Sequence, residues 1–380
     1  MKRILIKLTA VMALAAAFPA QAEDLAFRNS PGPMRSMRAL GMGGAFIAID
    51  SADESTLFYN PAGINDFEEK VHMQFALPTA MMSYKAIGFA QDTLNLADDV
   101  DAAVSDSAKI DVFNAFTATH TGRYEEAGVQ GNLVNFMHKR LAASLFYENR
   151  TVVALTNPAS STVDIEASTM AGLQFGSALS FFDDHLQVGA AIKLIERHLI
   201  DETITQRDII STANFSDILD TNEYGFGVGG DIGVKASLPI DGKVWEALDP
   251  RFALTYQNIG DTRFTGNVGR LQSSLSAGAA IHPNFWKLKN SFAIDVRDLD
   301  HASDIITKLY LGLELTYPEI SKVLRTASVR LGASQGYFTA GLGLDFKYFK
   351  LNASTWGSEV GKTSRQKESR MFGVQLAAGF

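Results

Sequence analysis

Residues 371–380 read Met-Phe-Gly-Val-Gln-Leu-Ala-Ala-Gly-Phe, so apolar side chains from Phe372 to Phe380 alternate with glycine, glutamine and alanine. Successive side chains of a strand point to opposite faces, and this stretch therefore predicts a β-strand with one apolar face. The same period of two recurs along the chain. It is clearest at 186–194, 226–235, 309–317 and 341–348. The sequence thus predicts an all-β protein.

Alternation of this kind fits either a soluble antiparallel sheet or a transmembrane barrel. Three observations favour the barrel. The chain starts with an export signal, the strand spacing continues to the last residue, and a final strand ending in Phe380 resembles the signature that the barrel assembly machinery of bacterial outer membranes reads. In lipid the sheet has to close, because an open edge would leave backbone groups unpaired. We therefore expect a transmembrane antiparallel β-barrel.

The pattern predicts about fourteen strands, an even number that places both chain ends in the periplasm. We expect them near 70–78, 129–137, 141–147, 163–181, 186–200, 224–237, 251–258, 273–281, 290–297, 309–317, 326–333, 338–348, 350–356 and 371–380. Most of the long connections then lie outside the cell, at 79–128, 148–162, 201–223, 259–272, 298–308 and 357–370.

Residues 1–22 are expected to be a signal peptide. Basic residues begin the segment, an apolar stretch follows over 8–18, and small residues precede a cleavage site after Ala22. A buried N-terminal helix is the alternative. With the signal removed, the mature chain begins at Glu23 and is located in the outer membrane of a Gram-negative bacterium.

The composition excludes several classes. The chain has 380 residues, with 34 Lys and Arg against 42 Asp and Glu, and its net charge of −8 disfavours nucleic acid as a partner. It contains no cysteine, which excludes disulfides and thiolate chemistry. No cofactor and no metal site are expected, since the histidines are scattered.

Residues 38–64 carry a family resemblance. The cluster Gly41, Gly43 and Gly44 is followed by Asn60-Pro61-Ala62-Gly63. These motifs resemble the N-terminal signature of the FadL/TodX superfamily of outer-membrane transport barrels. Blocks at 230–233, 256–260 and 329–337 are more similar to its PorV-like and uncharacterised exported branch than to the fatty-acid transporters.

The resemblance implies a hatch inside the barrel. It assigns 23–66 to an N-terminal hatch, or plug, and 67–380 to the barrel with its extracellular loops. It also implies that hydrophobic substrates enter from outside, pass the hatch and leave sideways through a gap in the wall. Such a route delivers an apolar molecule into hydrocarbon instead of water. The implied hatch or ligand-binding residues are Phe46, Leu57, Phe58, Asn60, Pro61, Ala62 and Gly63.

Those residues also have a simpler interpretation. In the tetrapeptide, Pro61 fixes φ, Gly63 permits a positive φ and Asn60 can bond its own neighbouring backbone, which together make a rigid turn. The apolar residues are expected to pack, whether or not a ligand touches them. Charges on the inward face could anchor the hatch through ion pairs, although plain lumen polarity is the simpler interpretation. They are Asp231, Lys235, Asp295, Arg297, Glu314, Arg330, Asp345 and Lys347.

Other motifs point away from an enzyme. Residues 225–230 match a dinucleotide fingerprint, and residues 332–336 match a nucleophile elbow. Both motifs need a helix after the strand, whereas strand alternation continues through them here. At 92–106, acidic and apolar residues at helical spacing predict an external helix. It either caps a loop or gathers substrate on a stripe of Leu94, Ala97, Val100 and Val104.

Two classes of function remain open. The first is an outer-membrane channel of FadL type for passive uptake of hydrophobic small molecules, such as long-chain fatty acids. The alternative is a PorV-like interaction barrel that holds a secreted protein or a surface assembly, or a structural barrel without transport. The expected partners are outer-membrane lipid, the barrel assembly machinery and a hydrophobic small molecule.

Deletion of Phe380 should lower the amount of assembled, heat-modifiable barrel. Burial of its ring in the lipid-facing row contributes roughly 1.5–3 kcal/mol, and the resemblance makes it the assembly signal. Asn60→Ala should leave assembly nearly intact but change uptake of a hydrophobic probe or leakage of a polar dye. If Asn60→Ala abolished assembly while deletion of Phe380 left it unchanged, this assignment of Phe380 to assembly and Asn60 to the hatch would be wrong.

Overall fold

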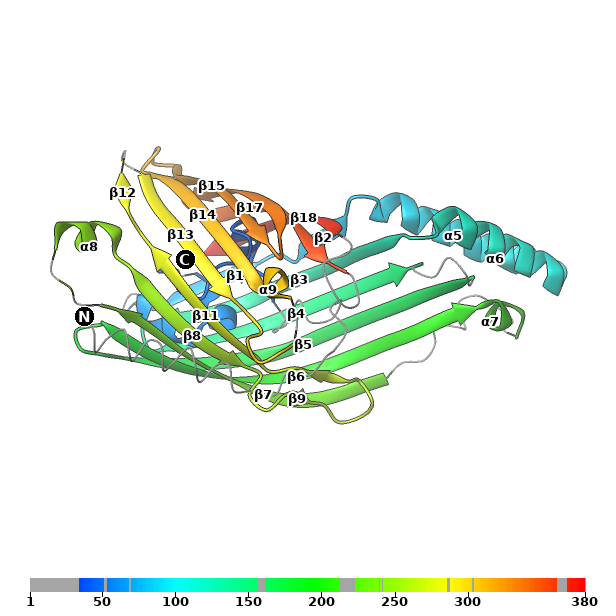
Figure 1. The fold of residues 1–380 in the computed structure, drawn as a ribbon, viewed down its shortest axis with the longest axis horizontal. Coiled ribbons are helices and arrows are strands. Elements are labelled where there is room, and N and C mark those ends of the chain that lie inside the picture. Colours follow the sequence, from blue (N-terminus) through cyan, green and yellow to red (C-terminus); the bar gives the residue numbers. More distant parts are fainter. Residues whose placement is uncertain are drawn as a thin grey trace.

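The computed structural model describes residues 34–50, 53–67, 70–155, 161–211, 223–238, 240, 242–285, 288–302, 304–360 and 368–379. The expected signal peptide at 1–22, the first part of the expected hatch and the side chain of Phe380 lie outside these residues. The described chain forms one barrel whose strands run in sequence order (Figure 1).

The strands of the wall follow the alternating segments of the sequence. They are β1 (His72–Ala76), β2 (Thr79–Ser83), β3 (Tyr124–His138), β4 (Leu141–Ala154), β5 (Thr162–Phe181), β6 (Leu186–Thr205), β7 (Glu223–Ser237), β8 (Arg251–Gln257), β11 (Ser274–Ile281), β12 (Asn284–Phe285), β13 (Leu288–Val296), β14 (Leu309–Pro318), β15 (Leu324–Ser334), β16 (Tyr337–Phe346), β17 (Phe349–Glu359) and β18 (Glu368–Gly379). Two short strands, β9 (Thr262–Arg263) and β10 (Arg270–Leu271), form a separate hairpin.

Pairing of the first and last strands closes the sheet. β1 and β2 share one position in the wall, between β18 and β3, and β12 only extends the pairing of β13. The described wall therefore has fourteen antiparallel positions, which confirms the strand number expected from the sequence.

The two faces of the wall differ as a membrane barrel requires. Outward side chains are apolar and exposed, as at Phe226 (50%), Leu342 (59%) and Val374 (55%). Inward positions are polar or glycine, and charged side chains such as Lys235 and Asp295 are almost fully buried there. The apolar exterior and polar interior identify a transmembrane β-barrel.

The two ends of the barrel differ. At one end, here called the turn end, short connections such as 139–140, 182–185 and 347–348 join the strands. The other end, here called the loop end, carries the longer connections. Among the described residues it holds the helices α5 (Ala86–Ala102), α6 (Asp106–His120) and α7 (Gln206–Ser211) at the ends of the longest strands, and a fourth, short helix, α9 (Ile305–Lys308), directly before β14.

Several strands continue beyond the expected boundaries. β5 and β6 have 20 residues each, whereas about 9–11 residues suffice to cross a bilayer. Together with β3 and β4 they reach far past the rest of the loop end and meet the helices (Figure 1). The expected loop at 79–128 likewise begins with strand β2 and ends inside β3.

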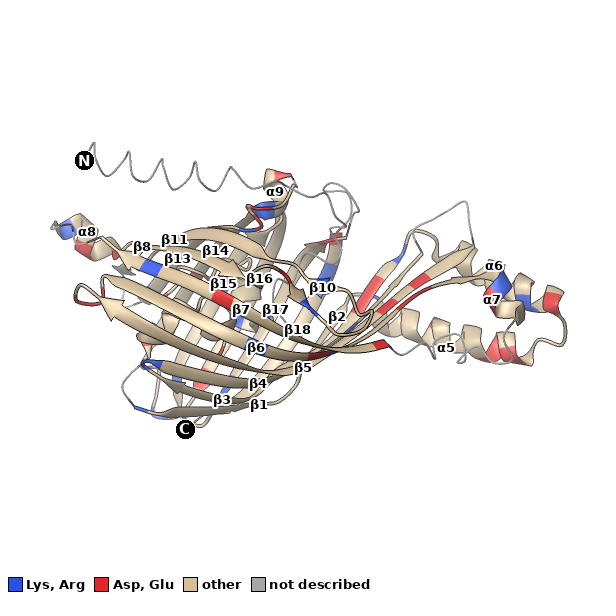
Figure 2. Ribbon diagram, turned by 90° about the horizontal axis from the view of Figure 1, so that it is seen from below, with Lys and Arg blue, Asp and Glu red and all other residues tan. Residues whose placement is uncertain are grey.

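The helices explain this extension. Outward-facing Val163, Ile165 and Ile204 lie in one buried cluster with Phe89 of α5 and Phe113 of α6. Helices thus cover the apolar outer face of the long strands where lipid no longer does. Figure 2 shows acidic residues on the helices at this tip.

The expected substrate-gathering stripe is not present on α5. Leu94 is 68% exposed and Val104 fully exposed, while Leu96 and Val100 are buried in the cluster that joins α5 to α6. The helix expected at 92–106 is the second half of α5, which ends at Ala102, and α5 pairs with α6. Within the described residues, no helix combines the length and apolar character needed to cross a membrane.

Strand parity predicts which end faces the medium. An epitope tag inserted at Asp208 of α7 should bind antibody on intact cells, and a tag at Lys139 in a turn should bind only after the envelope is broken. The expectation follows because both chain ends should lie at the turn end. Immunofluorescence with both tags tests this, and the reverse labelling pattern would show that the orientation is wrong.

Candidate functional site

The N-terminal segment, here defined as residues 34–50 and 53–67, lies inside the barrel (Figure 1). It contains the short helices α3 (Met37–Gly41) and α4 (Thr56–Tyr59) and the 3₁₀ helix η1 (Pro61–Asp66). Helix α3 lies against β15, β16 and β17, and η1 lies against β5, β6 and β7. The segment therefore fills the lumen between opposite walls.

Inward-facing glycines make room for this segment. A Cβ at Gly233 would lie 2.0 Å from Asn60 Oδ1, and one at Gly189 would lie 2.3 Å from the carbonyl carbon of Pro61. On the opposite wall, a Cβ at Gly332 would lie 2.5 Å from the backbone nitrogen of Gly43, where φ is +66°. A larger residue at any of these positions would displace the segment. The glycine-rich strand faces are thus its seat.

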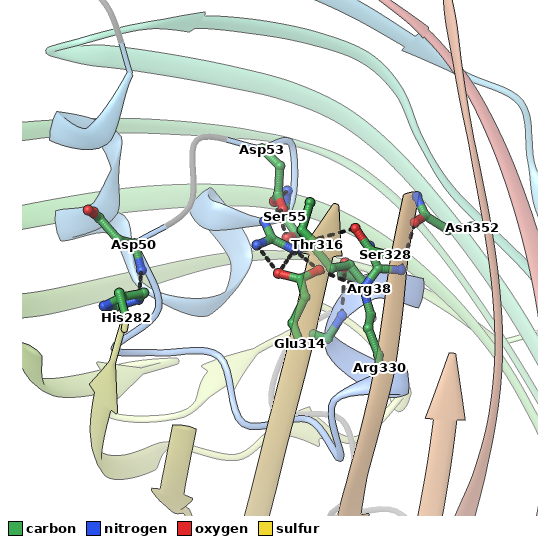
Figure 3. A network of polar contacts seen from close by, with 12 residues as sticks. Arg38, Asp50, Asp53, Ser55, His282, Glu314, Thr316, Ser328, Arg330 and Asn352 are labelled. Carbon is green, nitrogen blue, oxygen red and sulfur yellow. Dashed lines mark hydrogen bonds and ion pairs between the residues drawn. The ribbon is translucent and has the colours of Figure 1, made fainter. Parts of the chain in front are cut away.

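A buried ion network holds α3 to the wall (Figure 3). Arg38 Nε and Nη2 donate to the two oxygens of Glu314 at 3.0 and 2.5 Å, and Arg38 Nη1 donates to Asp53 Oδ2 at 2.7 Å. From the next strand, Arg330 Nε donates to Glu314 Oε1 at 2.7 Å. Arg330 Nη1 continues the network to Asn352 Oδ1 at 2.9 Å. Charge-assisted bonds of this kind fix orientation as well as position.

Asp53 is kept ionised by this network. Burial by itself would raise the pKa of the Asp53 carboxyl, but Arg38 and hydrogen bonds from Ser55 hold it below its usual value. The same two acids, Asp53 and Glu314, favour the charged form of Arg38 and raise its pKa despite burial.

A second clamp holds the chain after the glycine cluster. Asp295 Oδ2 accepts from the backbone nitrogens of Phe46 and Ile47 at 2.7 and 3.2 Å. Arg297 donates to the carbonyl of Gly44 and lies over the ring of Tyr310 at 4.5 Å. The inward charges at these positions therefore anchor the N-terminal segment, and the simpler interpretation as plain lumen polarity is wrong for them.

The Asn60-Pro61-Ala62-Gly63 run forms the expected turn. Asn60 caps η1 by accepting from Ala62 N at 3.0 Å, and its Nδ2 donates to Ile47 O at 2.8 Å. Gly63, however, does not adopt a positive φ. A Cβ there would lie 2.6 Å from Thr56 Cγ2, so the position needs a small residue for space, and the expectation of a left-handed backbone is wrong.

The three candidate apolar residues lie in one buried cluster around the turn. The ring of Phe46 is 5.0 Å from that of Tyr59, and the ring of Phe58 meets the edge of Phe146 at 5.7 Å. The side chain of Leu57 faces Gly176. All three therefore pack the N-terminal segment onto the wall, and a role in contacting a ligand stays a prediction.

At the turn end, one lysine holds two acids of the segment. Lys235 Nζ contacts Asp66 Oδ2 and lies 3.2 Å from Asp50 Oδ1. Arg251 lies 3.5 Å from Asp50 Oδ2. Burial raises the pKa of Asp66 to about 7, with Asp50 adding to the rise and Lys235 opposing it. Burial would raise the pKa of Asp50 too, but Lys235 and Arg251 lower it to about 2.

His282 completes this cluster. Its Nε2 accepts from Asp50 N at 3.1 Å, an interaction drawn in Figure 3. Burial lowers the pKa of His282, which keeps the imidazole neutral and able to accept that bond. Sequence reasoning included Lys235 among the inward charges but missed Asp50, Asp66 and His282. Their partners are far apart in the chain, so no local pattern marks them.

Small cavities remain around the N-terminal segment. One of about 40 Å³ lies on its loop-end side and is lined by residues that include Leu40, Tyr310 and Trp356. Two others, of about 190 and 270 Å³, lie on the β14–β18 side and share Asp345 and Lys350. Each of these three cavities is smaller than the roughly 300–1,000 Å³ of an ordinary ligand pocket.

No protein-family model and no curated protein matches the chain. Among solved structures, it is similar to the CymD monoaromatic hydrocarbon channel (11% identity over 96% of this chain and 98% of that chain, TM-score 0.46). It is also similar to the toluene transporter TbuX of Ralstonia pickettii, with 13% identity over 92% of this chain and 97% of that chain and a TM-score of 0.47. A third similar structure is the toluene transporter TodX of P. putida, with 12% identity over 90% of this chain and 96% of that chain and a TM-score of 0.44.

The Lys235 cluster predicts a pH-dependent seal. The pKa of Asp66 is raised in the docked segment, so docking is favoured while this carboxyl is protonated. The free energy that Asp66 contributes to docking is therefore complete below the ordinary pKa of an aspartate and is lost as pH rises through about 7. Asp50 does not change charge in that range. Leakage of a small polar dye from proteoliposomes should therefore increase between about pH 6 and pH 8.

Asp66→Asn is the matched control, since its side chain cannot ionise. Its dye leakage should be almost independent of pH over the same range. A wild-type leak that falls as pH rises would contradict the assignment of Asp66.

Proposed function

We propose that the protein is a passive channel for hydrophobic small molecules in the outer membrane of a Gram-negative bacterium. It is exported by the signal peptide at 1–22, which is cleaved after Ala22. The observation that supports this function best is a break in the strand pairing of the barrel wall, in a barrel whose central lumen is filled. An apolar molecule can then leave sideways into lipid without crossing water.

The break lies in the first strand. β1 ends at Ala76 and β2 begins at Thr79, with Leu77 and Pro78 between them. Pairing with β3 stops at Phe75–Val134 and resumes at Thr79–Gln130. Pro78 has no N–H to offer a neighbouring strand. Residues 76–78 and 131–133, here called the seam, therefore face each other without ladder pairs.

The seam is closed by close packing and is bonded to the N-terminal segment. A Cβ at Gly131 would lie 3.4 Å from Pro78 Cα. Beside it, Gln130 Oε1 accepts from Arg35 N at 3.1 Å, and Asn132 Nδ2 donates to Glu54 O at 3.2 Å. A shift of the segment would release both residues of β3 next to the seam, so the segment can control it.

An apolar and adaptable cluster lies on the loop-end side of the seam, beyond the polar inward side chains of Gln130 and Asn132. Met37, Leu40, Met81, Trp356 and Met371 form one buried cluster, in which Met81 belongs to β2 and Met371 to β18. Leu40 and Trp356 also line the small cavity on the loop-end side of the segment. Methionine side chains repack easily around different apolar groups. The cluster is therefore the apolar route that we propose from that cavity toward the seam.

The proposed mechanism uses no energy source and no catalysis. A hydrophobic molecule, such as a long-chain fatty acid, enters from the loop end and displaces the packing of Phe46, Leu57 and Phe58. The turn at Asn60–Gly63 keeps the segment on its glycine seat while α3 and its neighbours shift. The molecule then leaves through the seam.

A bulky residue at the seam should block this route. Gly131→Leu places a side chain against Pro78, and overpacking of this kind costs about 1–3 kcal/mol. That cost acts on the closed seam, but the leucine side chain would fill the exit when the two sides separate, so uptake should fall several-fold. Cellular uptake of a fluorescent hydrophobic probe measures the effect. The amount of heat-modifiable barrel shows whether assembly is unchanged.

Gly88→Leu on α5 is the matched control, because a Cβ at Gly88 meets no atom within 4 Å. Uptake should be normal in that variant. Equal uptake by Gly131→Leu and wild type would reject the seam as the exit. No uptake by the wild type, with recovery of a defined secreted protein in a pull-down, would favour the PorV-like interaction barrel instead.

A further inference from the structure

We infer that the loop between β8 and β11, residues 258–273, is an outer gate that closes the lumen above the N-terminal segment. The loop was expected to lie outside the barrel as an ordinary connection. Instead it folds onto the inner face of β7, over the glycine run that no function so far explains. The gate concerns access to the lumen from the loop end and is independent of the substrate and of the exit.

The loop is a structured hairpin and not an open connection. β9 pairs with β10 through Arg263–Arg270 and Thr262–Leu271. At its base, Asn258 Nδ2 donates to Gln272 O at 2.9 Å, and Asp261 Oδ1 accepts from Ser273 N at 2.9 Å. The hairpin can therefore move as one body about its base.

Three glycines of β7 form the seat of the hairpin. Gly225, Gly227 and Gly229 lie on the same face as Asp231 and Lys235, which is the inward face. A Cβ at Gly225 would lie 1.8 Å from Thr265 O, and one at Gly229 would lie 2.3 Å from Thr262 Oγ1. Gly227 forms a bridge with Phe264, and Thr265 N donates to Phe226 O at 2.9 Å. The glycine run therefore serves to admit the hairpin.

A buried ion pair fixes the base of the hairpin. Lys193 Nζ lies 2.8 Å from Asp231 Oδ1, and both side chains are 1% exposed. Asn258 joins the pair, since its N donates to Asp231 Oδ1 at 2.8 Å and its Oδ1 accepts from Lys193 Nζ at 2.5 Å. Gln174 Nε2 contacts Asp231 Oδ2 at 3.3 Å and Leu57 O at 3.0 Å. The hairpin and the N-terminal segment thus share one anchor.

The hairpin rests on the apolar cluster of the N-terminal segment. Leu271 is buried in that cluster, and Phe264 packs against it. Thr262 and Val268 are fully buried. Between the hairpin and the β4–β6 wall remains a cavity of about 100 Å³, lined by residues that include Met170, Arg197 and Arg270. The cavity is partly open, but Met170 in its lining is 7% exposed and lies in the same buried cluster as Leu271, so a solute from the loop end should reach Met170 freely only after the hairpin moves.

Cysteine labelling tests the gate directly, because the chain has no cysteine of its own. Met170→Cys places a thiol in the cavity below the hairpin. A membrane-impermeant maleimide added to intact cells should label it slowly. Adding Gly225→Val, which pushes against the backbone of Thr265, should raise the labelling rate severalfold. Heat-modifiability confirms that the barrel of each variant has assembled.

Gly230→Val is the matched control. Gly230 is a neighbour on the same strand but points outward, and its Cβ would lie 3.7 Å from Ala191 O, an ordinary contact. It should leave the labelling rate unchanged. Phe264→Ala is a second opening variant, which is used if Gly225→Val does not assemble. It only removes a side chain, and it should also raise the labelling rate of Met170→Cys. Fast labelling of Met170→Cys alone, or no effect of the opening variants in assembled barrels, would overturn the gate.

A second experiment separates the gate from the proposed transport. Bridge partners have Cα atoms about 4.5–5.5 Å apart, which suits a disulfide. The double variant Gly227→Cys and Phe264→Cys should therefore lock the hairpin when oxidised with diamide. Uptake of a hydrophobic probe should stop on oxidation and return on reduction. Unchanged uptake in the oxidised barrel, with the cysteine pair shown to be bonded, would overturn the gate as the entry point. Absence of uptake in both states would count against transport, and the labelling result would still stand.

Discussion

Closure of the sheet by β1 and β2 against β18 is the constraint on which the rest of the structure depends. In hydrocarbon, every backbone N–H and C=O must find a partner within the protein, and only a closed ring of strands provides one for each. Closing the ring at fourteen positions leaves an interior that its own wall side chains do not fill. Such a lumen either stays open to water or is occupied by other parts of the chain. Here it is occupied from both ends.

The way in which the lumen is filled explains the inward-facing glycines and the buried charges of the wall. Wall glycines let the backbones of the N-terminal segment and of the 258–273 loop approach the strands closely, which side chains would prevent. Buried charges then hold each part in one position. A buried ion pair contributes little net stability, because desolvation offsets most of the attraction, but removing one partner costs about 3–5 kcal/mol. These networks therefore specify where the segments dock more than how tightly the barrel holds together.

The two elements that fill the lumen are joined to each other as well as to the wall. Both filling elements are held to the wall by polar contacts, and the two are joined through Gln174 and Asp231. The methionine-containing cluster lies apart from the Lys193–Asp231 pair. Its residues come from α3, β2, β17 and β18, whereas the pair joins β6 and β7.

The sequence by itself determined the wall. Alternation of period two predicted each of the fourteen strand positions and the inward set of charges, because a strand has only two faces and lipid demands that one be apolar. It also predicted the turn at Asn60, where the interaction is between neighbours in the chain. The ends of β3–β6 were not predictable, since helices from a different part of the chain cover their outer faces.

Only the tertiary structure decided what occupies the lumen. Arg38 and Glu314 are separated by 276 residues, and Asp50 and Lys235 by 185. No periodicity links such pairs, because their partnership depends on how far each wall strand is staggered and where the inner segment docks. Gly63 illustrates the same limit. From the sequence, a glycine in this turn predicts a positive φ. The fold instead requires only that Gly63 has no side chain next to Thr56. A sequence pattern reports the period of a strand, but close approach between distant segments is settled by three-dimensional packing.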